Sequence, residues 1–328
     1  MGSQRKRLGL WLGALSLMMG MFVFYQMSST AQLEALTVDG GQLRMHLSQL
    51  AKERYNDLAL ARTRAYLTQE LRSYGYQPTT QPFGSGESTG KNLIVSRPGT
   101  QDPEHKILVG AHYDSVAGSP GADDNGSAVV AALEIACLFA NYPTDKTLQV
   151  VFFDQEELQP EGAGLVGSNA FVSEATNLQG LEGAVILEML GYACYDSGCQ
   201  SYPPGLEAEN LPDTGDFIGV IGDAEHPDLL ATFDTNNVDE MESPDSSLQA
   251  VTLPVPVGVL PFMPDLFRSD HVPFWLKGIG AVMVSDTANF RNPNYHRASD
   301  TFESLDLEFL EQTTQYLVDR VEKLLSIG

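Results

Sequence analysis

The stretch Ile107-Leu-Val-Gly-Ala-His-Tyr-Asp114 places polar side chains directly after a short apolar run. An apolar run of this length, bounded by turn residues, is typical of a buried β-strand. An apolar, helix-like segment follows at residues 127–141. A second strand-like run at residues 148–153 is again followed by acids, Glu156 and Glu157. This order of strand, helix and strand predicts a βαβ unit with parallel strands.

The same alternation continues along the chain and predicts the fold class. Two helices are expected in residues 41–74, and further helices in residues 167–174 and 305–325, the last with Ser304 as its N-cap. Further strands are expected at residues 92–96, 183–189 and 279–285. Alternating strands and helices imply an α/β fold, namely a three-layer αβα sandwich around a mostly parallel, mixed central sheet.

Residues 32–328 are expected to form a single domain. The stretch 202–268 is rich in Pro, Asp and Ser and contains only short apolar pieces. A long segment of this composition is typical of an insertion, and we expect it over the edge of the sheet and near the active site.

The charge of the chain restricts its partners. The sequence has 43 Asp and Glu residues against 19 Lys and Arg residues, which gives a formal charge of −24. A surface this acidic repels nucleic acids and anionic lipids, so peptides, sugars and small cations are the expected partners.

The first 31 residues have the pattern of a targeting segment. Three basic residues at positions 5–7 precede an apolar stretch without charges at residues 8–25. Its length allows either a retained membrane anchor or a signal peptide cleaved near residues 29–31. The basic flank predicts an inside N-terminus, so the remaining chain would be exported and either membrane-anchored or released outside the cytoplasm.

Three cysteines are too few for a disulfide framework. Cys194 and Cys199 lie five positions apart in a Gly-containing loop, and an exported chain could pair them. Cys137 lies in an apolar helical segment, where it is expected to act as a small buried hydrophobic residue.

Several predicted strands end in side chains that can bind a metal ion. His112 follows the strand expected at residues 106–111, Glu156 and Glu157 follow the strand at residues 148–153, and Glu188 lies at the end of a third. Ligands in α/β sheets gather beyond the carboxyl ends of the strands, so these side chains are expected to converge. Imidazoles and carboxylates suit zinc and similar divalent metals.

Within the Glu156-Glu157 pair, one carboxylate can bind a metal ion while its neighbour accepts a proton from an activated water. Asp114 is placed two residues after His112, where it can orient the imidazole, or it can be a turn residue. Asp124 lies in a loop that offers a further ligand, although a surface loop capped by Ser127 is the alternative.

Residue chemistry alone does not identify the second histidine ligand. His296 lies in a polar loop, and His271 lies in the segment Ser269-Asp-His271-Val-Pro-Phe274. The remaining histidines are expected to be structural or exposed, and they are His46, His105 and His226.

Taken in order, these motifs resemble those of the M28 metallopeptidases, a family of zinc aminopeptidases that act outside the cytoplasm. The resemblance covers about residues 43–325. It rests on a His-x-Asp segment, a Gly-Ala-Asp-Asp-Asn loop, a Glu-Glu pair, an acid at a strand end and a Tyr-His-x3-Asp-Thr segment. All five recurring in order is a far stronger signal than any one of them.

The resemblance implies the fold of zinc exopeptidases and two zinc ions per chain. Asp124 would bridge both ions, His112 and Glu188 would bind one, and Glu157 and His296 would bind the other. Many members of the family carry Asp where this chain has Glu188. A loop extension at residues 159–164 is a second departure from the family pattern and would reshape the substrate pocket.

The resemblance also implies roles for the residues around the metal ions. Glu156 would be the general base, Tyr295 would stabilise the oxyanion, and His271 would be supporting structure. The acids expected to support the ligands are Asp114, Asp270 and Asp300.

These inferences predict a di-zinc exopeptidase that removes N-terminal residues from peptides. One alternative is glutaminyl cyclase, which shares the fold and uses one zinc ion. The other is a non-catalytic ectodomain that acts as a receptor. The preferred N-terminal residue is not predicted, because residues 202–268 are expected to shape the pocket.

Overall fold

The computed structural model describes residues 35–85, 88–157, 164–206, 211–235, 248–259 and 262–327. Residues 37–328 form one compact unit. The predicted anchor or signal segment, residues 1–31, lies outside the described residues. Among the helices that are described, none combines the length and the apolar composition needed to cross a membrane.

The centre of this unit is a mixed sheet whose described strands run in the order β1-β2-β4-β3-β5-β8-β6-β7. Four neighbouring pairs are parallel (β4 with β3, β3 with β5, β5 with β8, β6 with β7) and three are antiparallel. The predicted mostly parallel sheet is therefore confirmed. The strands are β1 (Thr79–Ser85), β2 (Ser88–Arg97), β3 (Asp102–His112), β4 (Lys146–Phe153), β5 (Leu181–Glu188), β6 (Phe217–Asp223), β7 (Gln249–Val255) and β8 (Ala281–Ser285).

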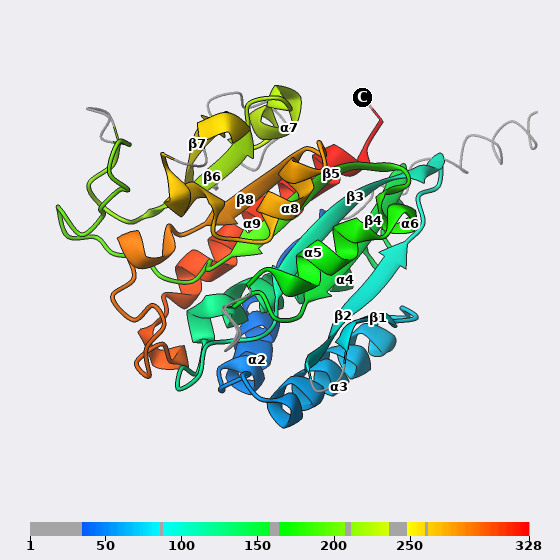
Figure 1. Ribbon diagram of the computed structural model, residues 1–328, viewed down its shortest axis with the longest axis horizontal. Helices are drawn as coiled ribbons and strands as arrows, with labels where there is room; N and C mark the ends of the chain where they lie inside the picture. The colour runs from blue at the N-terminus through cyan, green and yellow to red at the C-terminus, as the bar shows by residue number, and fades with distance from the viewer. Residues whose placement is uncertain are drawn as a thin grey trace, which may run out of the picture. The chain divides into compact units, whose positions relative to one another are not determined.

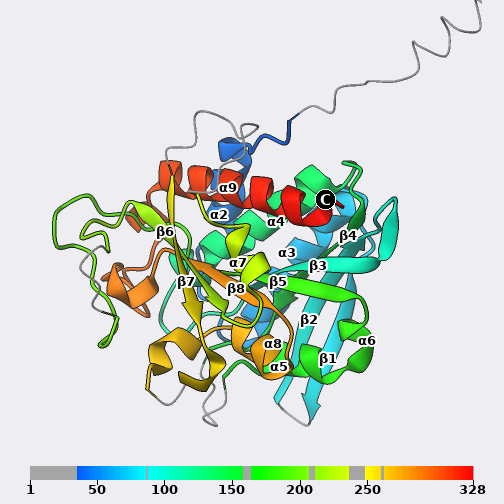
Figure 2. The ribbon, with the colours of Figure 1, turned by 90° about the horizontal axis from the view of Figure 1, so that it is seen from above.

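Helices cover both faces of the sheet, as the αβα prediction requires. Helices α2, α4 and α9 lie on one face, and α5, α6 and α8 lie on the other (Figures 1 and 2). The helices are α2 (Gly40–Leu50), α3 (Asp57–Ser73), α4 (Ala128–Phe139), α5 (Val166–Ser173), α6 (Ala175–Leu178), α7 (Pro227–Ala231), α8 (His271–Leu276) and α9 (Leu307–Leu325). The predicted helices and strands all occur, with boundaries that differ by a few residues.

The central strands are apolar on both sides because both sides are covered. Phe153 of β4 packs edge-on against Phe171 of α5 and Phe274 of α8, at centroid distances of 5.8 and 6.4 Å. Leu108 and Ile186 belong to the same buried cluster. Continuous apolar runs of this kind are expected for buried parallel strands.

Three strands were not predicted. β1 forms one edge of the sheet, and β6 and β7 form the other edge within residues 202–268. The sequence of β6, Phe-Ile-Gly-Val-Ile-Gly-Asp, is interrupted by glycines, and β7 contains Pro254, which weakens the strand pattern in both. This part of the chain therefore extends the sheet as well as adding loops to it.

The predicted N-cap of the last helix was wrong by two residues. Asp306, and not Ser304, caps α9, and its carboxylate accepts hydrogen bonds from the backbone N–H of Glu308 and Phe309 at 3.1 and 3.0 Å. Ser304 instead closes a capping box with Thr301 in the preceding short turn. Both are helix-start signals, and the carboxylate is additionally favoured by the helix dipole.

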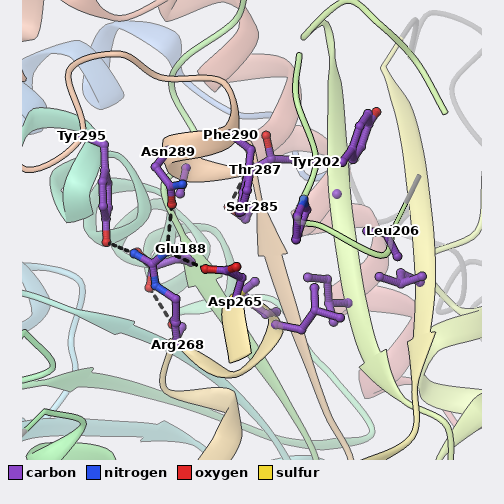
Figure 3. A pocket seen from close by; sticks show the side chains of 18 of the residues that line it. Glu188, Tyr202, Leu206, Asp265, Arg268, Ser285, Thr287, Asn289, Phe290 and Tyr295 are labelled. Carbon is purple, nitrogen blue, oxygen red and sulfur yellow. Dashed lines mark hydrogen bonds and ion pairs between the residues drawn. The ribbon is translucent and has the colours of Figure 1, made fainter. Parts of the chain in front are cut away.

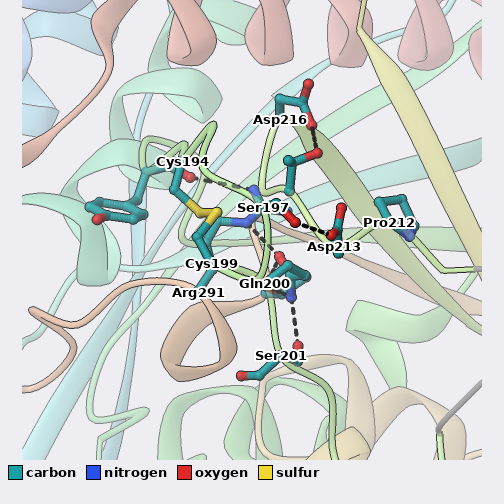
Figure 4. The surroundings of a disulfide bond; sticks show 12 residues. Cys194, Ser197, Cys199, Gln200, Ser201, Pro212, Asp213, Asp216 and Arg291 are labelled. Carbon is teal, nitrogen blue, oxygen red and sulfur yellow. Dashed lines mark hydrogen bonds between the residues drawn. A yellow bond between two sulfur atoms is a disulfide. The ribbon is translucent and has the colours of Figure 1, made fainter.

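Cys194 and Cys199 form a disulfide (Figure 4). The loop that the disulfide closes, residues 194–199, is hydrogen-bonded to the segment before β6. Cys194 forms an isolated β-bridge with Gly215, and Ser197 Oγ donates to Asp213 at 2.5 Å. The disulfide loop thus stabilises the segment that leads into β6. Cys137 was expected to be buried, but it is only partly buried, and burial raises the pKa of its thiol to about 11.

The double variant Cys194→Ser, Cys199→Ser should be less stable than the wild type. Opening a loop of this size restores conformational freedom to the unfolded chain and costs about 2 kcal/mol of unfolding free energy. The expected fall in melting temperature is on the order of 4 °C. Scanning calorimetry of both chains would measure it, with Cys137→Ser as a control that breaks no disulfide. An unchanged melting temperature would show that the disulfide does not stabilise this segment.

Candidate metal centre

The carboxyl ends of three adjacent strands bring together the side chains predicted from strand ends. His112 is the last residue of β3 and Glu188 is the last residue of β5, while Glu156 and Glu157 follow β4 after two intervening residues. All four residues are buried. The convergence follows from the parallel pairing of β4, β3 and β5.

Asp124 lies between these strand ends. It belongs to a short turn, Ala122–Ser127, that leads into α4 and is entirely buried, so the surface-loop interpretation was wrong. The peptide bond from Asp124 to Asn125 is cis. Asp124 Oδ1 lies 3.5 Å from His112 Nε2, and Oδ2 lies 3.1 Å from His296 Nε2. One carboxylate therefore faces both histidines.

The described residues contain two groups of side chains that could each hold a metal ion. One comprises His112, Asp124 and Glu188, and the other comprises Asp124, Glu157 and His296. His112 Nε2 lies 3.4 Å from Glu188 Oε1, and His296 Nε2 lies 3.2 Å from Glu157 Oε2. These are the five side chains predicted as ligands, divided as the family resemblance implied.

The charges in this centre suit a cation. Burial, followed by the charge of Asp124, raises the pKa of Glu157 to about 7. Burial also raises the pKa of Glu156 well above its usual range, and the neighbouring charges of Glu188 and Glu157 act in the same direction. Acids held this close repel one another unless positive charge lies between them, so the donor set fits divalent metal ions.

Two further predicted acids contact the predicted ligands and the backbone around them. Asp114 Oδ1 lies 3.3 Å from His112 Nδ1, and its two oxygens accept from the backbone N–H of Glu156 and Glu157, both at 3.1 Å. Asp300 accepts from the backbone N–H of Asp124 at 3.1 Å. Such contacts fix the orientation of ligand side chains.

Three supporting residues were not predicted from the sequence. Asn125 donates to the carbonyl of Leu187 at 3.0 Å and accepts from the N–H of Met189 at 2.8 Å, so it holds the backbone on both sides of Glu188. Arg54 is buried and donates to several backbone carbonyls, including that of Gly121 at 2.8 Å. Its positive charge lies close to the acids of the centre.

The third is Ser269, whose hydroxyl donates to Glu188 Oε2 at 2.5 Å. This hydrogen bond holds the Glu188 carboxylate in position. In the sequence, only its position next to Asp270 indicated that Ser269 lies near the centre.

Tyr295 lies beside the centre. Its ring stacks on His296 with centroids 3.8 Å apart, and its hydroxyl accepts a hydrogen bond from Arg268 at 2.6 Å. Arg268 also contacts Asn289 and Asp265 (Figure 3). Burial raises the pKa of Tyr295 above its usual value. The hydroxyl therefore keeps its proton at neutral pH.

His271, the competing ligand, belongs to neither donor group among the described residues. It is fully buried, its Nε2 lies 3.0 Å from the carbonyl of Leu266, and its ring packs edge-on against Trp275. Asp270 is also fully buried, and burial raises the pKa of its carboxyl to about 7, although the charge of His112 opposes this.

The other histidines lie outside the centre, as predicted. His46 is buried between the hydroxyls of Tyr66 and Tyr74, at 2.6 and 3.1 Å. His105 and His226 each pair with an aspartate three residues before them.

A cavity of about 550 Å³ opens onto the centre. Its lining includes the proposed ligands Asp124, Glu157, Glu188 and His296 together with Glu156. The cavity continues over β6, β7 and β8, so the unpredicted strands shape it. A cavity of this volume is large enough to bind a small molecule or the end of a peptide.

Sequence comparison agrees with this geometry. Residues 92–211 match the model of Peptidase family M28. The chain is 32% identical to the protein YfbL of Escherichia coli (strain K12) over 274 residues, which cover 79% of each chain. It is 28% identical to Aminopeptidase YwaD of Bacillus subtilis (strain 168) over 242 residues, which cover 68% of this chain and 42% of that protein.

Structural comparison shows the same fold in solved proteins. A zinc aminopeptidase from Bacillus subtilis, BSAP, matches with a TM-score of 0.67 at 16% identity, over 89% of this chain and 97% of the other. Fimbriiglobus ruber glutaminyl cyclase matches with a TM-score of 0.63 at 18% identity, over 90% and 99%. The fold is thus shared by two kinds of enzyme, and the sequence decides the family. With its motif-bearing region matched and a relative aligned over most of its length, the chain belongs to peptidase family M28.

Proposed function

We propose that this chain is a di-zinc aminopeptidase that removes N-terminal residues from peptides. The observation that carries the proposal is the position of Asp124, whose two carboxylate oxygens face two different histidines. A carboxylate placed in this way can bridge two metal ions. Family membership and the relatives named as aminopeptidases support the class of reaction.

In this proposal, His112 and Glu188 bind one zinc ion, Glu157 and His296 bind the other, and Asp124 binds both. Two nitrogen and three carboxylate ligands leave open positions for water and substrate, as catalytic zinc sites require. Asp114 and Asp300 are not ligands in this scheme, and they hold the ligands in place through the contacts described above.

Zinc at this centre would supply a Lewis acid that polarises the scissile carbonyl and lowers the pKa of a bound water. Glu156 is assigned as the general base because it lines the cavity but belongs to neither donor group. Its carboxylate would accept the proton of the attacking water and then transfer it to the amine that leaves. The backbone N–H of Glu156 donates to Asp114, which fixes its position.

Tyr295 is assigned to the oxyanion that forms on the carbonyl oxygen. Arg268 can only donate hydrogen bonds, so the Tyr295 hydroxyl acts as acceptor in that pair and retains its own proton to donate. A donor directed at developing negative charge lowers the barrier to the reaction.

We also propose that the enzyme works outside the cytoplasm. The disulfide between Cys194 and Cys199 supports this, because structural disulfides persist in oxidising compartments. The basic and apolar pattern of residues 5–25 would direct export and could anchor the chain in the membrane.

The alternative activity is that of a glutaminyl cyclase with one zinc ion. The second donor group, Asp124, Glu157 and His296, favours two metal ions. The non-catalytic ectodomain is disfavoured because all five predicted ligands fall into the two donor groups, and four of them line the same cavity as Glu156.

A metal chelator should abolish the hydrolysis of aminoacyl reporter substrates, and added zinc should restore it. Loss of the metal removes both the activation of water and the polarisation of the carbonyl, so the expected loss of rate is at least about 1,000-fold. The measurement is the initial rate of reporter release with chelator and after zinc is added back.

Reporters with an acetylated α-amine are the matched control, because an aminopeptidase requires a free amine and should leave them intact. Chelator-resistant hydrolysis would rule out the metal-dependent mechanism. Cyclisation of N-terminal glutamine without hydrolysis of any reporter would establish the cyclase alternative.

A further inference from the structure

The register of the sheet connects the metal centre to the chamber over β6, β7 and β8. Glu188 of β5 pairs with Ser285 of β8, Ser285 pairs with Gly219 of β6, and Gly219 pairs with Val251 of β7. Adjacent strands are about 4.8 Å apart, so Gly219 lies about 10 Å from the proposed ligand Glu188. This row is the part of the sheet that a group bound at the metal centre would reach first.

The small residues of this row leave space above the sheet. Ser285 carries only a hydroxymethyl group, and Gly219 carries no side chain. A Cβ at Gly219 would meet its nearest atoms, the Ser285 carbonyl oxygen and Thr287 Cγ2, at 3.4 Å, which is ordinary van der Waals contact. The position therefore does not require glycine for packing, and its lack of a side chain enlarges the cavity.

Larger apolar residues surround this space. The next row on the same face of the sheet lies two residues further along each strand and consists of Met283, Ile221 and Leu253. These side chains line the cavity as the row of Ser285 and Gly219 does, because side chains alternate between the two faces along a strand. Phe217 lies in the lining on the other side of Gly219. The floor and sides of the chamber are thus aliphatic and aromatic.

The loop of residues 201–206 forms another wall of the chamber. Tyr202 and Leu206 line the cavity from residues 201–206, at the end opposite Glu188 and Tyr295 (Figure 3). The Tyr202 hydroxyl donates to the carbonyl of Pro212 at 2.6 Å, and the N–H of Ser201 donates to the carbonyl of Phe290 at 2.8 Å. These hydrogen bonds fix the position of the loop that bounds the chamber.

The charged groups of the cavity lie at the other end. The described lining has seven acidic or basic side chains, which are Asp124, Glu156, Glu157, Glu188, Asp265, Arg268 and His296. None of the described residues that line the chamber over β6 and β7 carries a charge. A charged group placed there would lose its hydration without gaining a partner, which is costly.

From this arrangement we infer that the chamber binds the side chain of the substrate's N-terminal residue and selects large apolar side chains, with Gly219 providing the necessary depth. This inference rests on the proposed aminopeptidase function. An aminopeptidase substrate has one residue before the scissile bond, so the space for that residue can end within the protein, while the rest of the peptide must leave towards solvent.

The size of the cavity supports large side chains over small ones. Its volume of about 550 Å³ lies within the range of about 300–1,000 Å³ that is typical of ligand pockets. The metal centre takes part of that volume, and the remainder still exceeds the methyl group of alanine. A leucine, methionine or phenylalanine side chain would displace water from the apolar floor and gain the free energy of its burial.

The test compares reporters with N-terminal Phe, Leu, Ala, Asp and Lys on the zinc-loaded wild type and on Gly219→Val. For the wild type, kcat/KM should be about 10- to 100-fold higher for Phe and Leu than for Ala, and lowest for Asp and Lys. In Gly219→Val the ratio of Phe to Ala should fall at least about tenfold, while the Ala reporter stays within about threefold of wild type.

Two further variants make the test specific. Met283→Ala should enlarge the chamber, and with a Trp reporter added to the panel it should raise the ratio of kcat/KM for Trp to that for Leu. Gly258→Val is the matched control, because it adds the same atoms where a Cβ would have nothing within 4 Å, and it should keep the wild-type profile. Melting temperatures identify any variant that fails to fold, and Met283→Ala then carries the test.

The possible failures are distinguishable. If zinc-loaded wild type cleaves no reporter, the proposed function fails. If it cleaves reporters but prefers Ala, Asp or Lys, or if Gly219→Val lowers all rates equally, the inference about the chamber is wrong while the proposed function stands.

Discussion

Replacing Glu156 with glutamine should abolish turnover while leaving the zinc content unchanged. The amide has nearly the shape of the carboxylate but cannot accept a proton from water at neutral pH. General-base catalysis by one side chain contributes about 100- to 10,000-fold, so kcat should fall by about 1,000-fold or more. The measurement is kcat on the best aminoacyl reporter, together with zinc content by mass spectrometry under native conditions.

The position of Glu156 makes this separation of effects possible. Its Oε2 lies 3.9 Å from His112 Nε2, within the same buried pocket, yet Glu156 is absent from both donor groups. The neighbouring variant Glu157→Gln changes a proposed ligand, and it should lower the zinc content as well as the rate. The two adjacent substitutions thus distinguish a base from a ligand.

Glu182→Gln is the matched control. Glu182 lies near the start of β5, at the end of the strand away from Glu188, and its carboxylate pairs with Lys146 at the start of β4 at 2.8 Å. A partly exposed pair of this kind contributes little to stability. The control should keep full activity. If Glu156→Gln retains more than about a tenth of the wild-type kcat, Glu156 is not the general base.

The parts of the centre that could be predicted from sequence are those that follow from strand geometry. His112, Glu157 and Glu188 each lie at or just after the end of an apolar run, and parallel pairing then brings them together. Asp124 and His296 lie in loops, so no periodicity places them. Only the order of motifs along the chain identified them, and it also ranked His296 above His271.

Two supporting residues, Arg54 and Asn125, could not be predicted because their partners are mainly backbone atoms. Arg54 donates to carbonyl groups that adopt their positions only in the folded loop before Asp124. Asn125 likewise spans the backbone on either side of Glu188. Neither residue type at those positions indicates a metal centre without the fold.

The chamber was beyond prediction for a different reason. It depends on the pairing of β6 with β8, an antiparallel contact between segments that are more than 50 residues apart. The glycines that weaken the strand pattern of β6 include Gly219, whose missing side chain deepens the cavity. The same residue thus hid the strand in the sequence and shapes the site in the structure.

Replacing Asp124 with alanine should remove zinc from both positions. Its oxygens lie 3.5 Å from His112 Nε2 and 3.1 Å from His296 Nε2, so one truncation removes a donor from each group. The remaining pairs, His112 with Glu188 and Glu157 with His296, each keep two ligands, fewer than the three that catalytic zinc sites have. Activity should therefore be lost along with both ions.

Native mass spectrometry would separate this result from the loss of a single ion. Wild type should carry two zinc ions, Glu188→Ala should keep the ion bound by Asp124, Glu157 and His296, and Asp124→Ala should carry none. A wild type with only one tightly bound zinc ion would contradict the di-zinc proposal and support the cyclase alternative.

Thermal unfolding gives an independent measure of metal binding by these variants. A metal that binds only the folded state raises the melting temperature, so a chelator should lower it in the wild type. In Asp124→Ala the chelator should have no further effect, because no bound metal remains to be removed. Asp228→Ala changes an exposed acid on α7 and should respond to the chelator as the wild type does. If Asp124→Ala still responds in full, Asp124 does not bridge the two ions, because a bridging ligand is the one side chain whose loss must weaken both sites together.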